Sequence, residues 1–265
     1  MNITAFYTFI LRVCMIMLAS ICATIQSSTN LYIVIHGTWS SASLWHMPGG
    51  DFYEALAVSC DKFSARVIPF GWSGKNDHMI RARAARCLMQ LIASYPDDTK
   101  IHIVAHSHGA NVGIIASQLM AYNPRNKYRI ESFYALGVPV CTQNYMPHMQ
   151  VIRFFYNLFS FNDMVQPVFG FFKRHYPLHE RIANLRVILN DVQPGHSALH
   201  DPLIGQWIPG IHRMFRDEHV GNFQVFDFTV PGLVIFKDRQ IPHYYVDTEQ
   251  ETLIKRDKEI QCVLK

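Results

Sequence analysis

The fold of this chain is decided by one stretch, Ile101-His102-Ile103-Val104-Ala105-His106-Ser107-His108-Gly109-Ala110-Asn111. Its first part is apolar and rich in β-branched residues, which favours a buried strand. Small and aliphatic residues at helical spacing follow from 110 to 119, which predicts a helix. A strand that meets a helix directly at Ser107 has to turn very tightly. We therefore predict a strained backbone at this serine.

The turn matches the nucleophile-elbow pattern small-x-Ser-x-Gly, with Ala105 and Gly109 as its small residues. Small residues at these positions let the strand and the helix pass closely, and the strained serine holds its hydroxyl clear of the sheet. The N-terminus of the helix offers unpaired N–H groups to a developing oxyanion. The pattern alone also fits an ordinary turn, so its meaning depends on partners elsewhere in the chain.

Apolar runs elsewhere in the sequence predict further strands, and they alternate with predicted helices. The helix expected over 78–95 has an apolar stripe, with Arg81 and Arg83 expected to face outward. Strands that alternate with helices predict a three-layer α/β fold with a mostly parallel central sheet. The predicted strands cover 31–35, 65–70, 101–105, 132–136, 151–159 and 185–189, and a short helix is expected over 52–58.

Three residues with complementary chemistry follow predicted strands, where ligand sites of such sheets lie. A serine nucleophile needs a base, and the base needs an acid that orients it. The chain order Ser107, Asp163, His196 is the order expected for this fold. Asp191 is the rival acid and His200 the rival base. We take Ser107, Asp163 and His196 as the candidate catalytic residues.

These segments together resemble an α/β-hydrolase serine esterase or lipase of the compact kind, over roughly residues 31–209. The resemblance implies an oxyanion hole formed by the backbone N–H groups of Thr38 and His108, and little or no cap domain. Ala105 replaces the usual glycine, as in known lipase-like variants. The matching segments are His36-Gly37-Thr38, Phe70-Gly71-Trp72-Ser73-Gly74, Ala105-His106-Ser107-His108-Gly109, Leu136-Gly137-Val138-Pro139, Asp163-Met164-Val165-Gln166-Pro167 and Gly195-His196-Ser197.

The expected activity is hydrolysis of carboxylic esters through an acyl-enzyme. A thioesterase or amidase on the same residues, or a non-catalytic binding protein with this fold, remains an alternative. Trp39, Trp72 and Met164 are the expected substrate contacts, because they lie in loops around the site. The side chains of His106 and His108 are expected to point away from Ser107. The expected substrate is a small-molecule or lipid ester, and no cofactor or metal is expected.

Composition limits the remaining classes of function. The 265 residues are 49% hydrophobic and 17% charged, with a formal net charge of +4, which is typical of a globular chain. Basic residues are scattered along the sequence, so no nucleic-acid partner is expected. None of the six cysteines forms a Cys-x-x-Cys motif, so a zinc site is not expected either. Cys87 is expected to be a buried thiol on a helix.

The chain divides into three parts. Residues 1–26 predict a signal peptide or an N-terminal membrane anchor, which indicates an exported (secreted or periplasmic) or membrane-anchored protein rather than a cytoplasmic one. Residues 31–215 form the expected hydrolase domain. Residues 216–265 form a C-terminal extension whose strand-like segments pack on that domain. The aromatic and basic stretch 167–181 fits either a surface helix or a wall of the site that meets lipid or an acyl chain.

Overall fold

The computed structural model describes residues 29–170, 173–218, 223–228, 232–237 and 241–246. The leader expected over residues 1–26 lies outside the described residues. Within them, no helix is both long enough and apolar enough to cross a bilayer.

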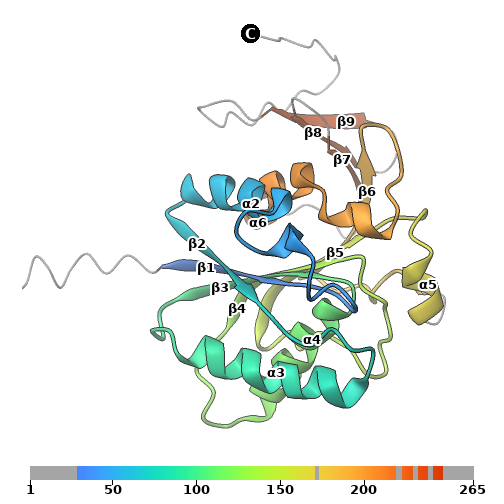
Figure 1. Cartoon of the computed structure of the whole chain (residues 1–265). Helices are drawn as coiled ribbons and strands as arrows, with labels where there is room; N and C mark the ends of the chain where they lie inside the picture. The colour runs from blue at the N-terminus through green and yellow to red at the C-terminus, as the bar shows by residue number, and fades with distance from the viewer. Residues whose placement is uncertain (1–28, 171–172, 219–222, 229–231, 238–240, 247–265) are drawn as a thin grey trace, which may run out of the picture.

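A single nine-stranded sheet forms the centre of the molecule, in the order β2-β1-β3-β4-β5-β6-β7-β8-β9 (Figure 1). The neighbours from β2 to β7 pair in parallel, whereas β8 and β9 are added antiparallel. The described segments 223–228, 232–237 and 241–246 thus continue the sheet. The strands are β1 (Asn30–Ile35), β2 (Ala65–Phe70), β3 (Lys100–His106), β4 (Ile130–Leu136), β5 (Ile152–Phe159), β6 (Ile182–Leu189), β7 (Phe223–Phe228), β8 (Gly232–Lys237) and β9 (Ile241–Val246).

Helices cover both faces of this sheet. Figure 1 shows α2 and α6 on one face and α3 and α4 on the other. The central strands bury both of their faces, as the apolar runs require, and one hydrophobic cluster lies on each side of the sheet. The helices are α2 (Asp51–Asp61), α3 (His78–Ala93), α4 (His108–Tyr122), α5 (Val165–Phe169) and α6 (Pro202–Glu218), with 3₁₀ turns η1 (Leu44–His46) and η2 (His196–His200).

Side-chain caps fix the starts of two helices. The Asp77 carboxylate accepts from the Ile80 N–H at 2.9 Å at the start of α3. Asp201 accepts from the Leu203 N–H at 2.9 Å where α6 begins. Each cap satisfies one N–H that the helix itself leaves unpaired.

The architecture confirms the predicted three-layer fold with a mostly parallel sheet and little or no cap. Two local expectations were wrong, and one of two open alternatives is excluded. Arg81 is buried rather than outward, because its guanidinium hydrogen-bonds the Tyr145 hydroxyl and the Asn76 side chain. Cys87 is exposed. Of the two alternatives for 167–181, the described residues do not form the surface helix, because α5 ends at Phe169 and the chain from 173 to 178 is irregular; a wall of the site stays a prediction.

Candidate active site

Ser107 occupies the tight turn between β3 and α4. Its φ of 55° and ψ of −134° lie in a region that non-glycine residues rarely adopt, so the predicted backbone strain is present. The turn is held by a hydrogen bond of 2.8 Å from the Ser107 N–H to the carbonyl of Leu136 at the end of β4. The serine is therefore fixed to the sheet edge by its backbone.

Two glycines let the end of β1 approach this turn. A Cβ on Gly109 would lie 2.3 Å from the His36 carbonyl oxygen, and a Cβ on Gly37 would lie 2.8 Å from Ser107 Cβ. Neither position can carry a side chain without displacing backbone or the serine. The loop that begins at Gly37 consequently lies directly beside Ser107.

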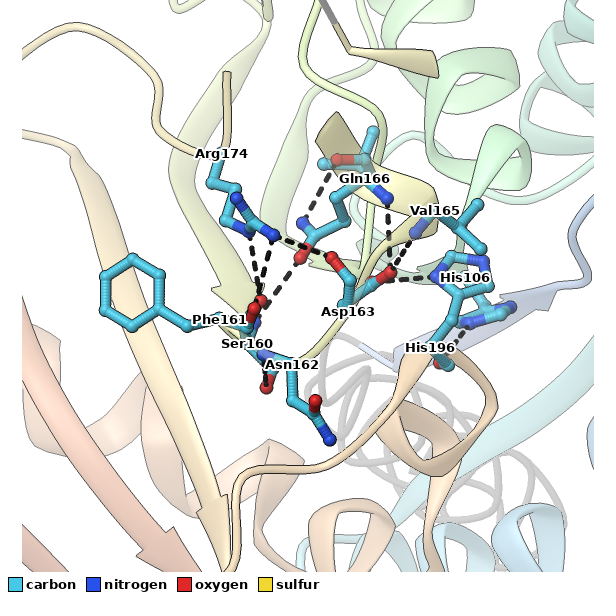
Figure 2. Close-up of polar contacts among 10 residues, drawn as sticks. His106, Ser160, Phe161, Asn162, Asp163, Val165, Gln166, Arg174 and His196 are labelled. Carbon is cyan, nitrogen blue, oxygen red and sulfur yellow. Dashed lines mark hydrogen bonds and ion pairs between the residues drawn. The ribbon is translucent and has the colours of Figure 1, made fainter. Parts of the chain in front are cut away.

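Asp163 lies in the turn after β5, and its side chain is completely buried. Oδ1 accepts from the N–H groups of Val165 at 2.9 Å and Gln166 at 3.1 Å. Oδ2 accepts from His196 Nδ1 at 2.7 Å. Figure 2 shows this carboxylate between the imidazole on one side and Arg174 on the other.

The loop that carries Asp163 is held by Arg174. The guanidinium donates from Nε to the Ser160 carbonyl at 3.2 Å, and from Nη2 to the carbonyls of Phe161 at 3.2 Å and Asp163 at 2.9 Å (Figure 2). Arg174 therefore fixes the backbone of the acid rather than its carboxylate. The sequence carried only a weak signal for this role, since Arg174 is one of several cations in a basic stretch.

His196 begins η2, in the loop after β6. Because Asp163 can only accept, Nδ1 carries the proton of their hydrogen bond, and Nε2 is left as the basic nitrogen. Gly137 makes room for the pair: with φ at +63°, a Cβ there would lie 3.1 Å from Asp163 Oδ2 and 3.2 Å from His196 Nδ1. Two loops from different strand ends thus meet over a glycine.

The rival candidates have other surroundings. His200 stacks on the indole of Trp45, with ring centroids 4.4 Å apart and planes inclined by 7°. The backbone N–H of Asp191 donates to the Asp227 carboxylate at 3.4 Å. Two acids and two bases were considered. Among the residues that the structure describes, the only pair of these in contact is Asp163 with His196.

The two histidines beside Ser107 have structural partners. His106 Nε2 lies 3.0 Å from the His196 carbonyl oxygen, and the two rings are 4.6 Å apart. His108 Nδ1 lies 3.1 Å from the amide nitrogen of Asn111. Burial lowers the pKa of His106 well below its usual range, and burial and then Arg81 lower the pKa of His108 to about 3. Both imidazoles are therefore neutral near pH 7. The role of His106 was missed at the sequence level.

The expected substrate contacts divide into two groups. Trp39 and Met164 are 77% and 66% exposed, in the loops after β1 and β5. Trp72 is buried, and its indole N–H donates to the His36 carbonyl at 2.8 Å while its own carbonyl lies 3.0 Å from His36 Nε2. The substrate contact expected of Trp72 stays a prediction; in the structure its indole braces the loop behind Ser107.

The remaining site residues are Thr38 and His108. His108 is the first residue of α4, so its N–H belongs to the first turn, which has no intrahelical acceptors. Thr38 directly follows Gly37, the residue that touches Ser107. Among the described residues, no group of three or more His, Cys, Asp or Glu side chains is arranged to hold a metal ion.

The parallel sheet, the strained serine before a helix and the His–Asp pair at the same sheet edge define the class of α/β hydrolases. The family model for lipase (class 3) matches residues 24–172, more than half of the chain. The chain belongs to the class 3 lipases, and it is a carboxylic ester hydrolase. The matched span contains Ser107 and Asp163 and ends before His196.

Several solved structures resemble the chain at low identity. A metagenomic carboxyl esterase is 12% identical, with 62% of this chain and 50% of that one covered and a TM-score of 0.36. This chain thus spans half the length of that esterase. A cutinase-like protein from Cryptococcus sp. is 9% identical, with 74% and 96% covered and a TM-score of 0.43. Est1E from Butyrivibrio proteoclasticus is 10% identical, with 78% and 81% covered and a TM-score of 0.36.

Because these TM-scores are below 0.5, the family assignment rests on the match to the lipase (class 3) family model. The search of curated protein sequences found no match.

Proposed function

We propose that this hydrolase cleaves its esters with Ser107 as nucleophile, His196 as general base and Asp163 as the acid that orients the base. The observation that carries the proposal is the 2.7 Å hydrogen bond between His196 Nδ1 and Asp163 Oδ2, beside the strained serine turn. A buried carboxylate in this position holds the imidazole in one tautomer and stabilises the imidazolium that forms.

The reaction runs in two halves. Ser107 Oγ attacks the ester carbonyl while His196 Nε2 takes the hydroxyl proton, and a tetrahedral oxyanion forms. His196 returns that proton to the leaving alcohol as the C–O bond breaks, which leaves an acyl-serine. Water then attacks the acyl-serine with His196 again as base. The carboxylic acid leaves and Ser107 recovers its proton.

Charge on the oxyanion is met by backbone donors. We assign this role to the N–H groups of His108 and Thr38. The first lies at the N-terminus of α4, where the helix dipole favours negative charge. The second lies in the loop that Gly37 holds against Ser107. Backbone donors fixed before the reaction need no reorganisation when the charge develops.

The proposed substrate is a small-molecule or lipid ester with an apolar acyl group. Exposed apolar side chains in the segments after β1 and β5 support this choice: Trp39, Met164 and Phe169 are between 39% and 77% exposed. Each methylene removed from water contributes about 0.8 kcal/mol. A growing acyl chain therefore gains binding free energy until the available apolar surface is covered.

Labelling with a fluorophosphonate probe tests the nucleophile directly. The wild-type chain is expected to be labelled and Ser107→Ala unlabelled, while Ser94→Ala, at an exposed serine that ends α3, keeps full labelling. Parallel assays on matched ester, thioester and amide substrates determine which bond is cleaved. A folded Ser107→Ala variant that is still labelled would contradict the assignment, and an unlabelled wild type would favour a non-catalytic binding protein.

A further inference from the structure

A hollow in the surface lies behind the loop that carries Asp163. It has a volume of about 310 Å³ and is lined by Phe161, Lys173, Arg174 and His175. Figure 2 shows Phe161 and Arg174 on the side of Asp163 opposite His196, so the hollow is separate from the Ser107 turn. Nothing in the proposed reaction uses these side chains for chemistry.

Cations concentrate around the ring of Phe161. The guanidinium carbon of Arg186, which projects from β6, lies 4.9 Å from the ring centroid, and that of Arg174 lies 5.9 Å from it. Lys173 is exposed at the same hollow. In the sequence the basic residues are scattered. In the folded chain some of them lie together, because β6 brings Arg186 beside Phe161, which is 25 positions earlier in the chain.

Within the part of the chain that the structure describes, none of the ion pairs involves Lys173, Arg174 or Arg186. The carboxylate of Asp163 is engaged elsewhere, with two backbone N–H groups and His196. Three positive charges therefore share one small area, and an anion bound there would relieve their mutual repulsion.

Two further details, one of Arg186 and one of Arg174, indicate that these side chains can bind a ligand. Arg186 Nε is buried and has no hydrogen-bond partner among the described residues. Arg174 binds its three carbonyls through Nε and Nη2, so its Nη1 group takes no part in holding the loop. A buried donor without an acceptor costs free energy, and an oxyanion supplies acceptors in several directions.

We propose that this hollow is a binding site for an oxyanion of phosphate chemistry, either free phosphate or the phosphate of a ligand's headgroup. The guanidinium groups of Arg174 and Arg186 offer planar pairs of donors that suit phosphate oxygens, and Lys173 adds a mobile point charge. The Phe161 ring provides an apolar surface for the group attached to the phosphate. Only the case in which that headgroup belongs to the substrate rests on the proposed ester hydrolysis.

Direct binding of inorganic phosphate is the first test, and it is made on the full-length Ser107→Ala chain so that catalysis plays no part. Titration at constant ionic strength, with chloride as the reference anion, is followed by ³¹P NMR or calorimetry. The double variant Lys173→Gln/Arg186→Gln is expected to lose at least about tenfold in phosphate affinity, as expected when charge-assisted hydrogen bonds are removed. Arg125→Gln, at an exposed arginine outside the hollow, is the matched control and is expected to bind normally.

Arg186 is partly buried, so a second variant separates loss of the site from loss of structure. Arg186→Lys keeps the charge and removes the planar fork, and it is expected to retain part of the affinity. Thermal unfolding of each variant identifies any that is simply destabilised. Lys173→Gln, at an exposed position, is expected to weaken phosphate binding without changing the unfolding temperature.

The source of the phosphate is decided by a second experiment. Hydrolysis of an acyl glycerol phosphate is compared with that of the uncharged acyl glycerol of equal chain length in the active enzyme. A several-fold fall in the ratio of their kcat/KM values in the double variant assigns the site to a substrate headgroup. An unchanged ratio together with phosphate binding assigns it to free phosphate.

Two outcomes overturn the proposal. One is phosphate affinity that is no greater than that for chloride, or equal in the wild type and the double variant. The other is the absence of phosphate binding combined with a loss of attachment to anionic vesicles in the double variant, which would make the cations part of a membrane contact. If no ester is hydrolysed, the proposed catalysis fails, but the phosphate titration still decides this site.

Discussion

The imidazole of His106 donates from Nε2 to the backbone carbonyl of His196 at 3.0 Å. The residue before the candidate nucleophile is thereby joined to the backbone of the candidate base. His106 also packs against the ring of His200, with centroids 4.9 Å apart, and His200 stacks on Trp45. Buried aromatic rings on several sides hold this donor in one orientation.

This contact predicts that His106 positions the base. His106→Phe is expected to lower kcat by about tenfold with a smaller change in KM, because a misplaced imidazole slows proton transfer more than it weakens binding. His106→Gln, which restores an N–H near the same place, is expected to recover part of kcat. A fall in KM and kcat that tracks only a lower unfolding temperature would show a purely structural role.

The choice of base predicts a ranking of two histidine variants. His196→Ala is expected to lower turnover by about 10⁴-fold or more, and combination with Ser107→Ala is expected to add little, because members of a triad act as a unit. His200→Ala is expected to cost far less, since His200 makes a stacking contact with Trp45. Steady-state rates of ester hydrolysis measure both, and the reverse order would move the base to His200.

The choice of acid gives a matched pair of amide variants. Asp163→Asn is expected to lower turnover by about 10³- to 10⁴-fold, because an amide does not hold the imidazole in the reactive tautomer. Asp191→Asn is the control, since that residue lies beside Asp227. Equal losses in the two variants would contradict the assignment of the acid.

A partly buried network away from the site predicts how stability changes with pH. Glu131 Oε1 lies 3.4 Å from His212 Nε2 and accepts from Arg153 at 3.0 Å. The hydrogen bond with His212 and the charge of Arg153 lower the pKa of Glu131 to about 2, from about 4.5 in the unfolded chain. The stabilisation is therefore complete above pH 4.5 and is lost as the pH falls toward 2.

Glu131→Gln tests that sign. The variant is expected to be less stable than the wild type at pH 7 by about 1 kcal/mol, and the difference is expected to shrink at pH 3. Urea unfolding at the two pH values measures it. Glu180→Gln, at an exposed carboxylate, serves as the control. A difference that grows toward low pH would contradict the assigned direction.

The proposed apolar acyl group predicts a chain-length profile. With p-nitrophenyl esters, kcat/KM is expected to rise severalfold per added methylene, then level off or fall, with its maximum near medium length. Water-soluble esters are expected to be hydrolysed without an oil interface, since little or no cap is present. Maximal activity on acetate would indicate a small acyl pocket, and activity only on emulsified long chains would contradict an open site.

Much of this architecture follows from local sequence signals. The apolar runs predicted the central strands because those strands are buried on both faces, and Ser107, Asp163 and His196 were chosen because each follows a strand end. The direction of side chains in tight turns could not be predicted from such local signals. The partner of His106 depends on the strained backbone at Ser107 and on where the loop after β6 lies.

Contacts between loops of distant strands could not be predicted either. Arg186 reaches Phe161 only because β5 and β6 pair in a register that sets Arg186 opposite Phe159. Arg81 was misjudged because a charged side chain near a helix end can turn inward when a polar partner such as Tyr145 is present. These outcomes depend on tertiary structure that no local pattern contains.

The order of strands in the sheet has a consequence for how the candidate site forms during folding. Ser107 follows β3, Asp163 follows β5 and His196 follows β6, so the three are assembled by parallel pairings that close long loops of chain. Such pairings form slowly, because closing each loop lowers the entropy of the chain before the contacts between the strands compensate for that loss. During refolding, helices and local turns can therefore form before the chain is catalytically active. Activity is expected only after the last of these long-range strand pairings has formed.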